Sequence, residues 1–170
     1  MSEELLKKIP AETKLAYTAN TLTASITLLN KVLAPLVGSE KYNELNNKIW
    51  GEGAAILFPM IKKDFNIPGD DAIAAMNVFD VVANITISPE FEAERVEESP
   101  KRVVQRTTKC PWMERANEYG LTAEFASCPE GHQAWGVGGC KALNPKLTHK
   151  MTKFMTKGDP YCEYVVELEE

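Results

Sequence analysis

The sequence predicts an α+β protein in which N-terminal helices pack on a mostly antiparallel sheet with short interleaved helices. Two observations lead to this prediction. In residues 1–84 the apolar side chains recur at three- and four-residue steps, which is the period of an α-helix. In residues 85–170, β-branched and alternating segments separated by Gly and Pro turns are typical of strands. We expect one domain over residues 1–170, with a mainly helical part followed by a part that contains every cysteine.

Three helices are expected in the first half. An apolar stripe that runs from Leu15 to Leu33 predicts the first helix, and the pattern ends at Gly38. Ser39 is a suitable N-cap for a second helix, and its apolar positions continue to residue 65 with a kink or a break at Pro59. After a turn, a third helix is expected over residues 72–83. Its apolar residues lie on several faces, which indicates deep burial.

Strands are expected from residue 85 onward. The β-branched run at residues 85–88 ends before a proline, and residues 91–98 and 101–110 flank a Ser-Pro pair. The latter two segments predict two strands joined by a tight connection. Pro111 fits the first turn of a short helix that stops at Gly120. A final strand over residues 162–168 is indicated by strict alternation of side chains.

A helix is also expected between Asn144 and Gly158. Asn144 is a suitable cap, and the proline that follows it fits the first helical turn. In this helix four lysines would share one face, while Leu147, Met151 and Phe154 would share another. The lysines are Lys146, Lys150, Lys153 and Lys157.

Bulk composition restricts the partners. The 170 residues carry 19 Lys and Arg against 24 Asp and Glu, a net charge of −5, which argues against binding nucleic acid through the field of the whole protein. The N-terminus lacks the apolar core of a signal peptide, and no apolar run approaches a membrane span. We therefore expect a cytoplasmic protein that binds neither membrane nor nucleic acid. Disulfides are rare in that compartment, so the cysteines are interpreted as thiols, metal ligands or redox groups.

The four cysteines supply the ligand count of a structural zinc site. They are Cys110, Cys128, Cys140 and Cys162, and the intervals between them hold 17, 11 and 21 residues. No CxxC pair is present, so spacing alone leaves two alternatives open. Either the cysteines meet at a metal, or they are buried or reactive free thiols.

The segment CPEGHQAWGVGGC places an imidazole, a carboxylate and an indole between two cysteines. Its glycines allow close approach of the backbone to a ligand, so His132 is a candidate site residue. The alternative is a bulged strand whose Trp135 enters the core. His149 is expected on the Thr/Lys side of the last helix, in contact with solvent.

The motifs from residue 101 onward resemble the L-2-amino-thiazoline-4-carboxylic acid hydrolase-like family, which is itself similar to 4-vinyl reductase domains. The resemblance covers residues 45–168. It rests on Cys110-Pro111, Cys128, Asn144-Pro145, and Gly158-Asp159 followed by Cys162. Met151 lies in the region where the related sensor domains have a glutamate, which leaves one ligand of the metal undefined.

This resemblance implies hydrolysis of a C=N bond in a small cyclic thiazoline or amidine-like compound. The catalytic candidates are a cysteine nucleophile such as Cys140, with His132 as proton shuttle and Glu130 as its orienting group or base. Trp112 and Trp135 are the candidates for ligand binding. By the same resemblance Cys128 and Cys162 are the first candidates for metal ligands, joined by Cys110 and Cys140. Zinc is the first choice of metal and an iron–sulfur cluster the second.

Two other functions remain open. The protein is alternatively a non-catalytic small-molecule-binding or sensor domain with a structural zinc site, in which aromatic side chains line an apolar pocket. A third interpretation is a redox or metal-handling accessory protein with exposed thiols. The expected partners are a small-molecule ligand and a second copy of the chain in a homodimer.

Overall fold

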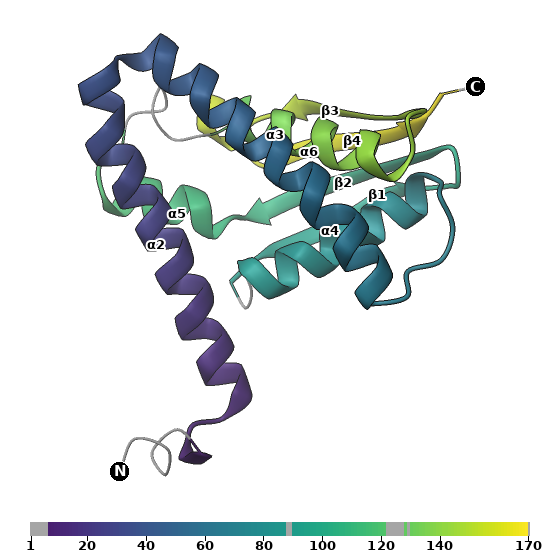
Figure 1. The fold of residues 1–170 in the computed structure, drawn as a ribbon, viewed down its shortest axis with the longest axis horizontal. Helices are drawn as coiled ribbons and strands as arrows, with labels where there is room; N and C mark the ends of the chain where they lie inside the picture. The colour runs from purple at the N-terminus through teal and green to yellow at the C-terminus, as the bar shows by residue number, and fades with distance from the viewer. Residues whose placement is uncertain (1–6, 88–89, 122–127, 129, 170) are drawn as a thin grey trace.

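The computed structural model describes residues 7–87, 90–121, 128 and 130–169. Its described part contains five α-helices and a four-stranded antiparallel sheet, which confirms the predicted α+β class (Figure 1). The helices are α2 (Ala11–Val37), α3 (Ser39–Asp64), α4 (Ala72–Thr86), α5 (Pro111–Glu118) and α6 (Glu130–Leu143). The strands are β1 (Glu92–Glu98), β2 (Arg102–Lys109), β3 (Leu147–Lys153) and β4 (Cys162–Leu168), and the 3-10 turn η2 (Met155–Lys157) precedes β4.

The three N-terminal helices lie where the apolar periodicity predicts them. Of the kink or break expected at Pro59, the break is wrong, because α3 runs from Ser39 through Pro59 to Asp64 as one helix. Asp71 caps α4 by accepting a hydrogen bond of 2.9 Å from the backbone N–H of Ala74. This helix extends to Thr86, whose hydroxyl donates to the carbonyl of Val82, so Ile85 and Thr86 are helical and do not begin a strand. Among the described residues, no helix is long and apolar enough to cross a bilayer.

The sheet has the strand order β1-β2-β4-β3, and every neighbouring pair is antiparallel. The predicted hairpin (β1 and β2), the short helix after it (α5) and the final strand (β4) are therefore confirmed. Register places Gln105 opposite Tyr164, and Thr107 opposite Cys162, on the face that the helices cover. This face carries the buried polar side chains of the sheet.

In residues 130–153 the helix and the extended segment lie in the reverse order to the prediction. Residues 130–143 form a helix, where a glycine-rich loop or bulged strand was expected, and residues 147–153 form a strand, where a lysine-faced helix was expected. Leu147 and Met151 are four residues apart, and this spacing satisfies both a helical face and an alternating strand. Pairing of β3 with β4 decides between them, since it satisfies the backbone of an extended segment. The four lysines consequently share no helical face.

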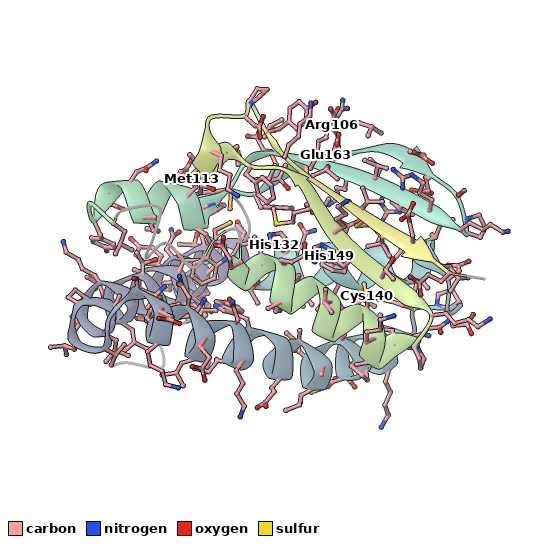
Figure 2. All side chains as sticks on the ribbon, turned by 90° about the horizontal axis from the view of Figure 1, so that it is seen from above. Arg106, Met113, His132, Cys140, His149 and Glu163 are labelled. Atoms are coloured by element: carbon pink, nitrogen blue, oxygen red, sulfur yellow. The ribbon has the colours of Figure 1, made fainter. Side chains whose placement is uncertain are left out.

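Helix α6 lies between the sheet and α3 (Figure 2). Its glycines face its neighbours closely: a Cβ on Gly138 would overlap the backbone of Gly51 in α3, and one on Gly136 would overlap the ring of His149 in β3. Gln133 joins α6 to the free edge of β3, because its amide donates to the carbonyl of His149 and accepts from the N–H of Met151, at 2.7 and 2.8 Å. Close packing therefore overrides the weak helix propensity of glycine.

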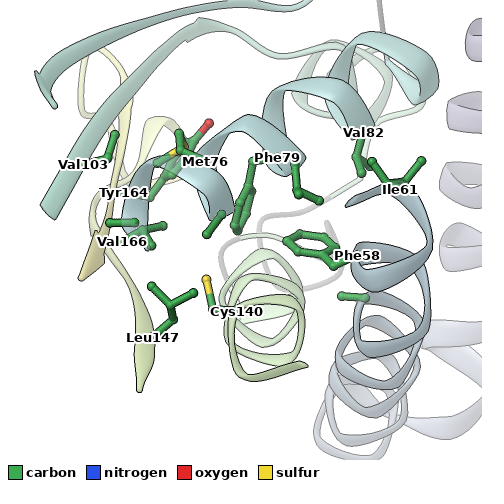
Figure 3. Packing of buried hydrophobic residues seen from close by; sticks show 14 of the residues in the cluster. Phe58, Ile61, Met76, Phe79, Val82, Val103, Cys140, Leu147, Tyr164 and Val166 are labelled. Carbon is green, nitrogen blue, oxygen red and sulfur yellow. The ribbon is translucent and has the colours of Figure 1, made fainter. Parts of the chain in front are cut away.

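The hydrophobic core fills the space between α3, α4, α6 and the sheet (Figure 3). Phe58 is fully buried and meets Phe79 and Trp135 edge to face, with ring centroids 4.8 and 4.7 Å apart. Cys140 lies in this core, where Figure 3 shows its sulfur close to Leu147.

Candidate functional site

A cavity of about 200 Å³ lies between the helices and the sheet. All five described helices, as well as β2 and β4, contribute to its wall. The three tryptophans of the chain, Trp50, Trp112 and Trp135, all border it. The remaining wall is mostly aliphatic or aromatic, and its polar and sulfur-bearing members are Thr86, Thr107, Cys110, Cys128, His132, Cys162 and Tyr164.

Three of the four cysteines line this cavity. Cys110 lies between β2 and α5, Cys128 lies just before α6, and Cys162 begins β4. Each is placed at the end or beginning of an element, where side chains converge without disturbing a packed interior. The Cys128 thiol interacts electrostatically with both Cys110 and Cys162, which sets these three apart as one group.

Cys140 does not belong to this group. It is fully buried among the apolar side chains of the core and does not line the cavity. His132 is eight residues earlier on the same helix, roughly 12 Å away along the axis. The predicted pairing of a Cys140 nucleophile with a His132 proton shuttle therefore lacks contact between the two residues.

All four thiols are neutral at physiological pH. Burial raises the pKa of Cys110 to about 11, against the weaker opposing effect of the backbone N–H groups of Met113 and Trp112. Burial also raises the pKa of Cys140 to about 12. The pKa values of Cys128 and Cys162 are raised as well, again mainly by burial. The Cys162 sulfur accepts a hydrogen bond from the backbone N–H of Met155 at 3.4 Å. Protonated, buried thiols are poor nucleophiles.

The described side chains do not form a ready metal site. In residues 7–87, 90–121, 128 and 130–169, no three His, Cys, Asp or Glu side chains are arranged to hold a metal ion. The three cavity cysteines share a wall but do not converge on one ligand sphere as they stand. The expected zinc or iron–sulfur centre therefore stays a prediction.

The two histidines of the chain lie next to each other inside the protein. His149 is 4% exposed and faces the helices from β3, so the expectation of a solvated side chain is wrong. Its ring stacks on Phe79 with centroids 5.4 Å apart. Burial lowers the pKa of His132 to about 4, and burial together with the neighbouring His132 lowers that of His149 well below 6.5. Both imidazoles are neutral at pH 7, so each offers one donor and one acceptor nitrogen.

Tyr164 links the cavity to a series of hydrogen-bonded polar side chains that are buried or partly buried. Its hydroxyl accepts a 2.8 Å hydrogen bond from the amide of Gln105, which also donates to the Asp80 carboxylate at 3.0 Å. Asp80 forms an ion pair of 2.5 Å with Arg95. Burial raises the pKa of Tyr164, so its hydroxyl stays protonated. These hydrogen bonds hold the Tyr164 hydroxyl in place at the polar end of the cavity.

Two aromatic groups form the apolar part of the wall. Trp135 contacts Phe79 edge to face at 4.9 Å, and Trp50 meets Trp112 in the same way at 5.7 Å. The indole N–H of Trp50 donates to the side-chain oxygen of Asn46 at 3.0 Å. Trp112 and Trp135, the predicted ligand-binding residues, therefore both lie on the cavity wall with their rings held by neighbours.

Glu130 lies apart from this cavity. It borders an open depression of about 600 Å³ on the outside of α6, together with Asn47, Phe154 and Lys157. Glu130 and His132 consequently face different surroundings, although only Gly131 separates them in the sequence. Sequence reasoning missed Tyr164 and Thr107 as wall residues. Both residues occupy alternating positions of predicted strands, and this pattern indicates which face of the strand is buried. It does not indicate that this face borders a cavity.

The fold is shared with solved structures of low sequence identity. The sequence matches no protein-family model, and no curated protein is similar to it. The phenol-responsive sensory domain of the transcription activator PoxR, solved with phenol, has a TM-score of 0.62 and 12% identity over 86% of this chain and 74% of that one. A trafficking protein particle complex subunit 3 from Naegleria fowleri, covalently bound to palmitic acid, has a TM-score of 0.54 and 11% identity over 87% and 95%. These similarities show the α+β fold, while membership of the thiazoline hydrolase-like family stays a prediction.

Proposed function

We propose that the protein is a non-catalytic binding domain for a small, largely apolar molecule of about one ring, held in the 200 Å³ cavity. The observation that carries the proposal is the size and lining of this cavity, which all three tryptophans border. An apolar protein cavity of ~150 Å³ is large enough to take up benzene. A cavity of about 200 Å³ therefore suits a one-ring compound with a small substituent.

A hydrogen-bonding group on the ligand is supported by the polar end of the cavity. His132 and Tyr164 both border the cavity, with ring centroids 5.2 Å apart. Among the described residues, Nε2 of His132 is buried with no hydrogen-bond partner. Buried polar atoms are normally satisfied by protein, water or ligand. A hydroxyl or carbonyl group on the ligand would meet this requirement after a small rotation of the imidazole ring.

The comparison with the PoxR sensory domain agrees with this chemistry. That domain responds to phenol, a single ring with one hydroxyl, and its similarity to this chain extends over 86% of the residues. The proposal for this chain nevertheless rests on its own cavity, since the identity between the two is 12%.

The geometry gives less support to the two other predicted functions. The candidates for hydrolysis lie in three different places, with Cys140 in the core, His132 at the cavity and Glu130 at the outer depression. Transfer of metal or electrons by exposed thiols is not supported either, because all four cysteines are buried or half-buried.

Tryptophan fluorescence provides a direct test, because every tryptophan borders the cavity. Titration of the full chain with phenol is expected to change the fluorescence saturably, and calorimetry is expected to give one site per chain. Toluene, which has a similar size but no hydroxyl, is expected to bind more weakly, and His132→Leu is expected to reduce this difference. N-acetyl-tryptophanamide is the control for quenching in solution. Absence of saturable binding for a panel of one-ring compounds, or turnover of cyclic C=N compounds, would refute the proposal.

A further inference from the structure

Helix α2 exposes an unusual amount of apolar surface. Of the eighteen large hydrophobic side chains that are exposed in the described residues, nine lie on this helix, and they are 39 to 75% exposed. In Figure 1 the N-terminal half of α2 extends away from the rest of the chain. The nine residues are Leu15, Tyr17, Leu22, Leu28, Leu29, Val32, Leu33, Leu36 and Val37. A contiguous apolar surface of this kind marks an interaction site.

The face of α2 that packs on the protein is small and polar. Its buried residues are Ala19, Thr23, Thr27, Asn30 and Ala34. The hydroxyls of Thr23 and Thr27 donate to carbonyls of their own helix, at 2.7 to 3.1 Å, and so need no outside partner. The amphipathic orientation of α2 is thus the reverse of that of an ordinary surface helix, whose apolar stripe faces the core.

Five of the nine exposed residues, together with the half-buried Ile26, follow a heptad. Leu15, Leu22, Leu29 and Leu36 are spaced by seven, and Ile26 and Leu33 follow the second and third of them by four residues. Leucine at position d with isoleucine or leucine at position a is the pattern of a coiled-coil seam. A seam of this kind is covered by a second helix with the same periodicity, rather than by a flat surface. Residues 15–36 extend over roughly 33 Å.

The residues that flank this seam carry no charge. At the positions next to it on the outer side lie Thr18, Ser25 and Val32. The charged residues of α2 are Glu12, Lys14 and Lys31, and Lys31 is engaged by a 2.6 Å hydrogen bond to the carbonyl of Tyr119. Two copies of α2 can therefore approach each other without repulsion between like charges.

The geometry points to a second copy of the chain as the partner of α2, through an isologous two-fold contact between the two heptad seams. A stable interface buries roughly 800 Å² of each partner. Seven of the nine exposed apolar side chains, all except Tyr17 and Leu28, lie in the seam or directly beside it, and their exposure of 39 to 75% provides the surface for such a contact. A lipid surface fits less well, since helices that lie on membranes carry Lys and Arg on their polar face. Here the polar face is buried against the protein.

The seam also borders the cavity. Leu22 and Ile26 belong both to the heptad and to the cavity wall. Pairing of two copies would therefore cover side chains that enclose the ligand, which connects dimer formation with the cavity. The dimer itself does not depend on the identity of any ligand.

The oligomeric state of the full chain tests the proposal. Light scattering after gel filtration is expected to give twice the 18.9 kDa mass of one chain at micromolar concentration. The double variant Leu29→Lys with Leu36→Lys is expected to weaken dimerisation by at least about 30-fold, the factor for loss of a central interface side chain. These leucines are 55 and 75% exposed and do not border the cavity, so the circular dichroism spectrum is expected to stay unchanged.

Ile56→Lys is the matched control, because Ile56 is 74% exposed on α3, outside the seam. It is expected to leave the dimer intact. A native chain that stays monomeric at 100 µM would overturn the proposal, as would a dimer that Ile56→Lys disrupts and the α2 variant does not. Recruitment of a monomeric native chain to phosphatidylcholine vesicles would assign the apolar face to a lipid surface instead.

Discussion

The rings of His132 and His149 stack with their centroids 5.7 Å apart and their planes 18° apart, although one residue belongs to α6 and the other to β3. Neither can take up a proton easily, because burial penalises the charged form and a charge on one ring would penalise a charge on the other. This pair couples the stability of the fold to pH.

Stability is expected to fall as the pH falls from 7 to 5. The pKa of His132 is about 4 in the folded protein and 6.5 in the unfolded chain, so the unfolded state binds more protons between these values. The stabilisation is complete above pH 6.5 and is lost as the pH approaches 4. For His132 alone the loss between pH 7 and pH 5 is roughly 2 kcal/mol. Urea unfolding at the two pH values measures it.

His132→Gln is the control for this effect, because glutamine keeps hydrogen-bonding groups but does not titrate in this range. Its free energy of unfolding is expected to change less between pH 7 and pH 5 than that of the native chain. An equal change in both proteins would assign the pH dependence to groups other than His132.

Filling the cavity is expected to abolish ligand binding without unfolding the protein. Ala83 borders the cavity from α4, and the ring of an Ala83→Phe variant would occupy much of the 200 Å³. The phenol-induced change in tryptophan fluorescence is expected to disappear, while the thermal midpoint stays within a few degrees. Ala55→Phe, at an exposed position of α3, is expected to bind as the native chain does. Unchanged binding by Ala83→Phe would place the ligand elsewhere.

The thiols are expected to react slowly with iodoacetamide at pH 8. Reactivity requires the thiolate, and burial raises the pKa of Cys110 to about 11 and that of Cys140 to about 12. Peptide mass spectrometry measures the rate for each cysteine. A bound one-ring compound is expected to slow the reaction of Cys110, Cys128 and Cys162, which border the cavity, and to leave the already slow Cys140 unchanged.

The same measurement examines the predicted zinc site. If zinc holds these three thiols, a chelator would increase their reaction rates and release stoichiometric metal. With neutral thiols and no bound metal, the chelator is expected to have no effect. A cysteine that reacts at the rate of a free thiol would contradict the raised pKa values.

The contact between α3 and α6 is expected to tolerate no side chain at Gly138. A Cβ there would overlap the backbone of Gly51, which cannot move aside as a flexible side chain would. Gly138→Ala is therefore expected to lower the free energy of unfolding by at least about 2 kcal/mol. Gly53→Ala is the matched control, because a Cβ at this position of α3 meets nothing within 4 Å. It is expected to stabilise the protein by about 0.5–1 kcal/mol, and denaturant unfolding distinguishes the two. Equal effects of both changes would contradict the close approach of the two helices.

The sequence alone determined the elements whose periodicity is unambiguous. The three N-terminal helices, the β1–β2 hairpin, α5 after Cys110-Pro111 and the strand β4 follow from local pattern and from capping or turn residues. It also indicated Trp112 and Trp135 as candidates for ligand binding, because both lie close to a cysteine in the sequence. Local sequence fixes such features, since they depend on neighbours within a few residues.

Tertiary structure decided which of the segments α6 and β3 is helical and which is extended. It also decided which face of α2 is buried. Gly136 and Gly138 weaken a helix in isolation, and only the close approach of α3 and β3 explains why they form one. His149 became buried because β3 pairs with β4 and turns alternate side chains inward. In α2, the leucines are exposed while Thr23 and Thr27 are buried. No periodicity reveals this, since a helical stripe has the same spacing whether it meets the protein's own core or a partner. Burial is a property of what lies opposite a side chain, and only the folded chain supplies that neighbour.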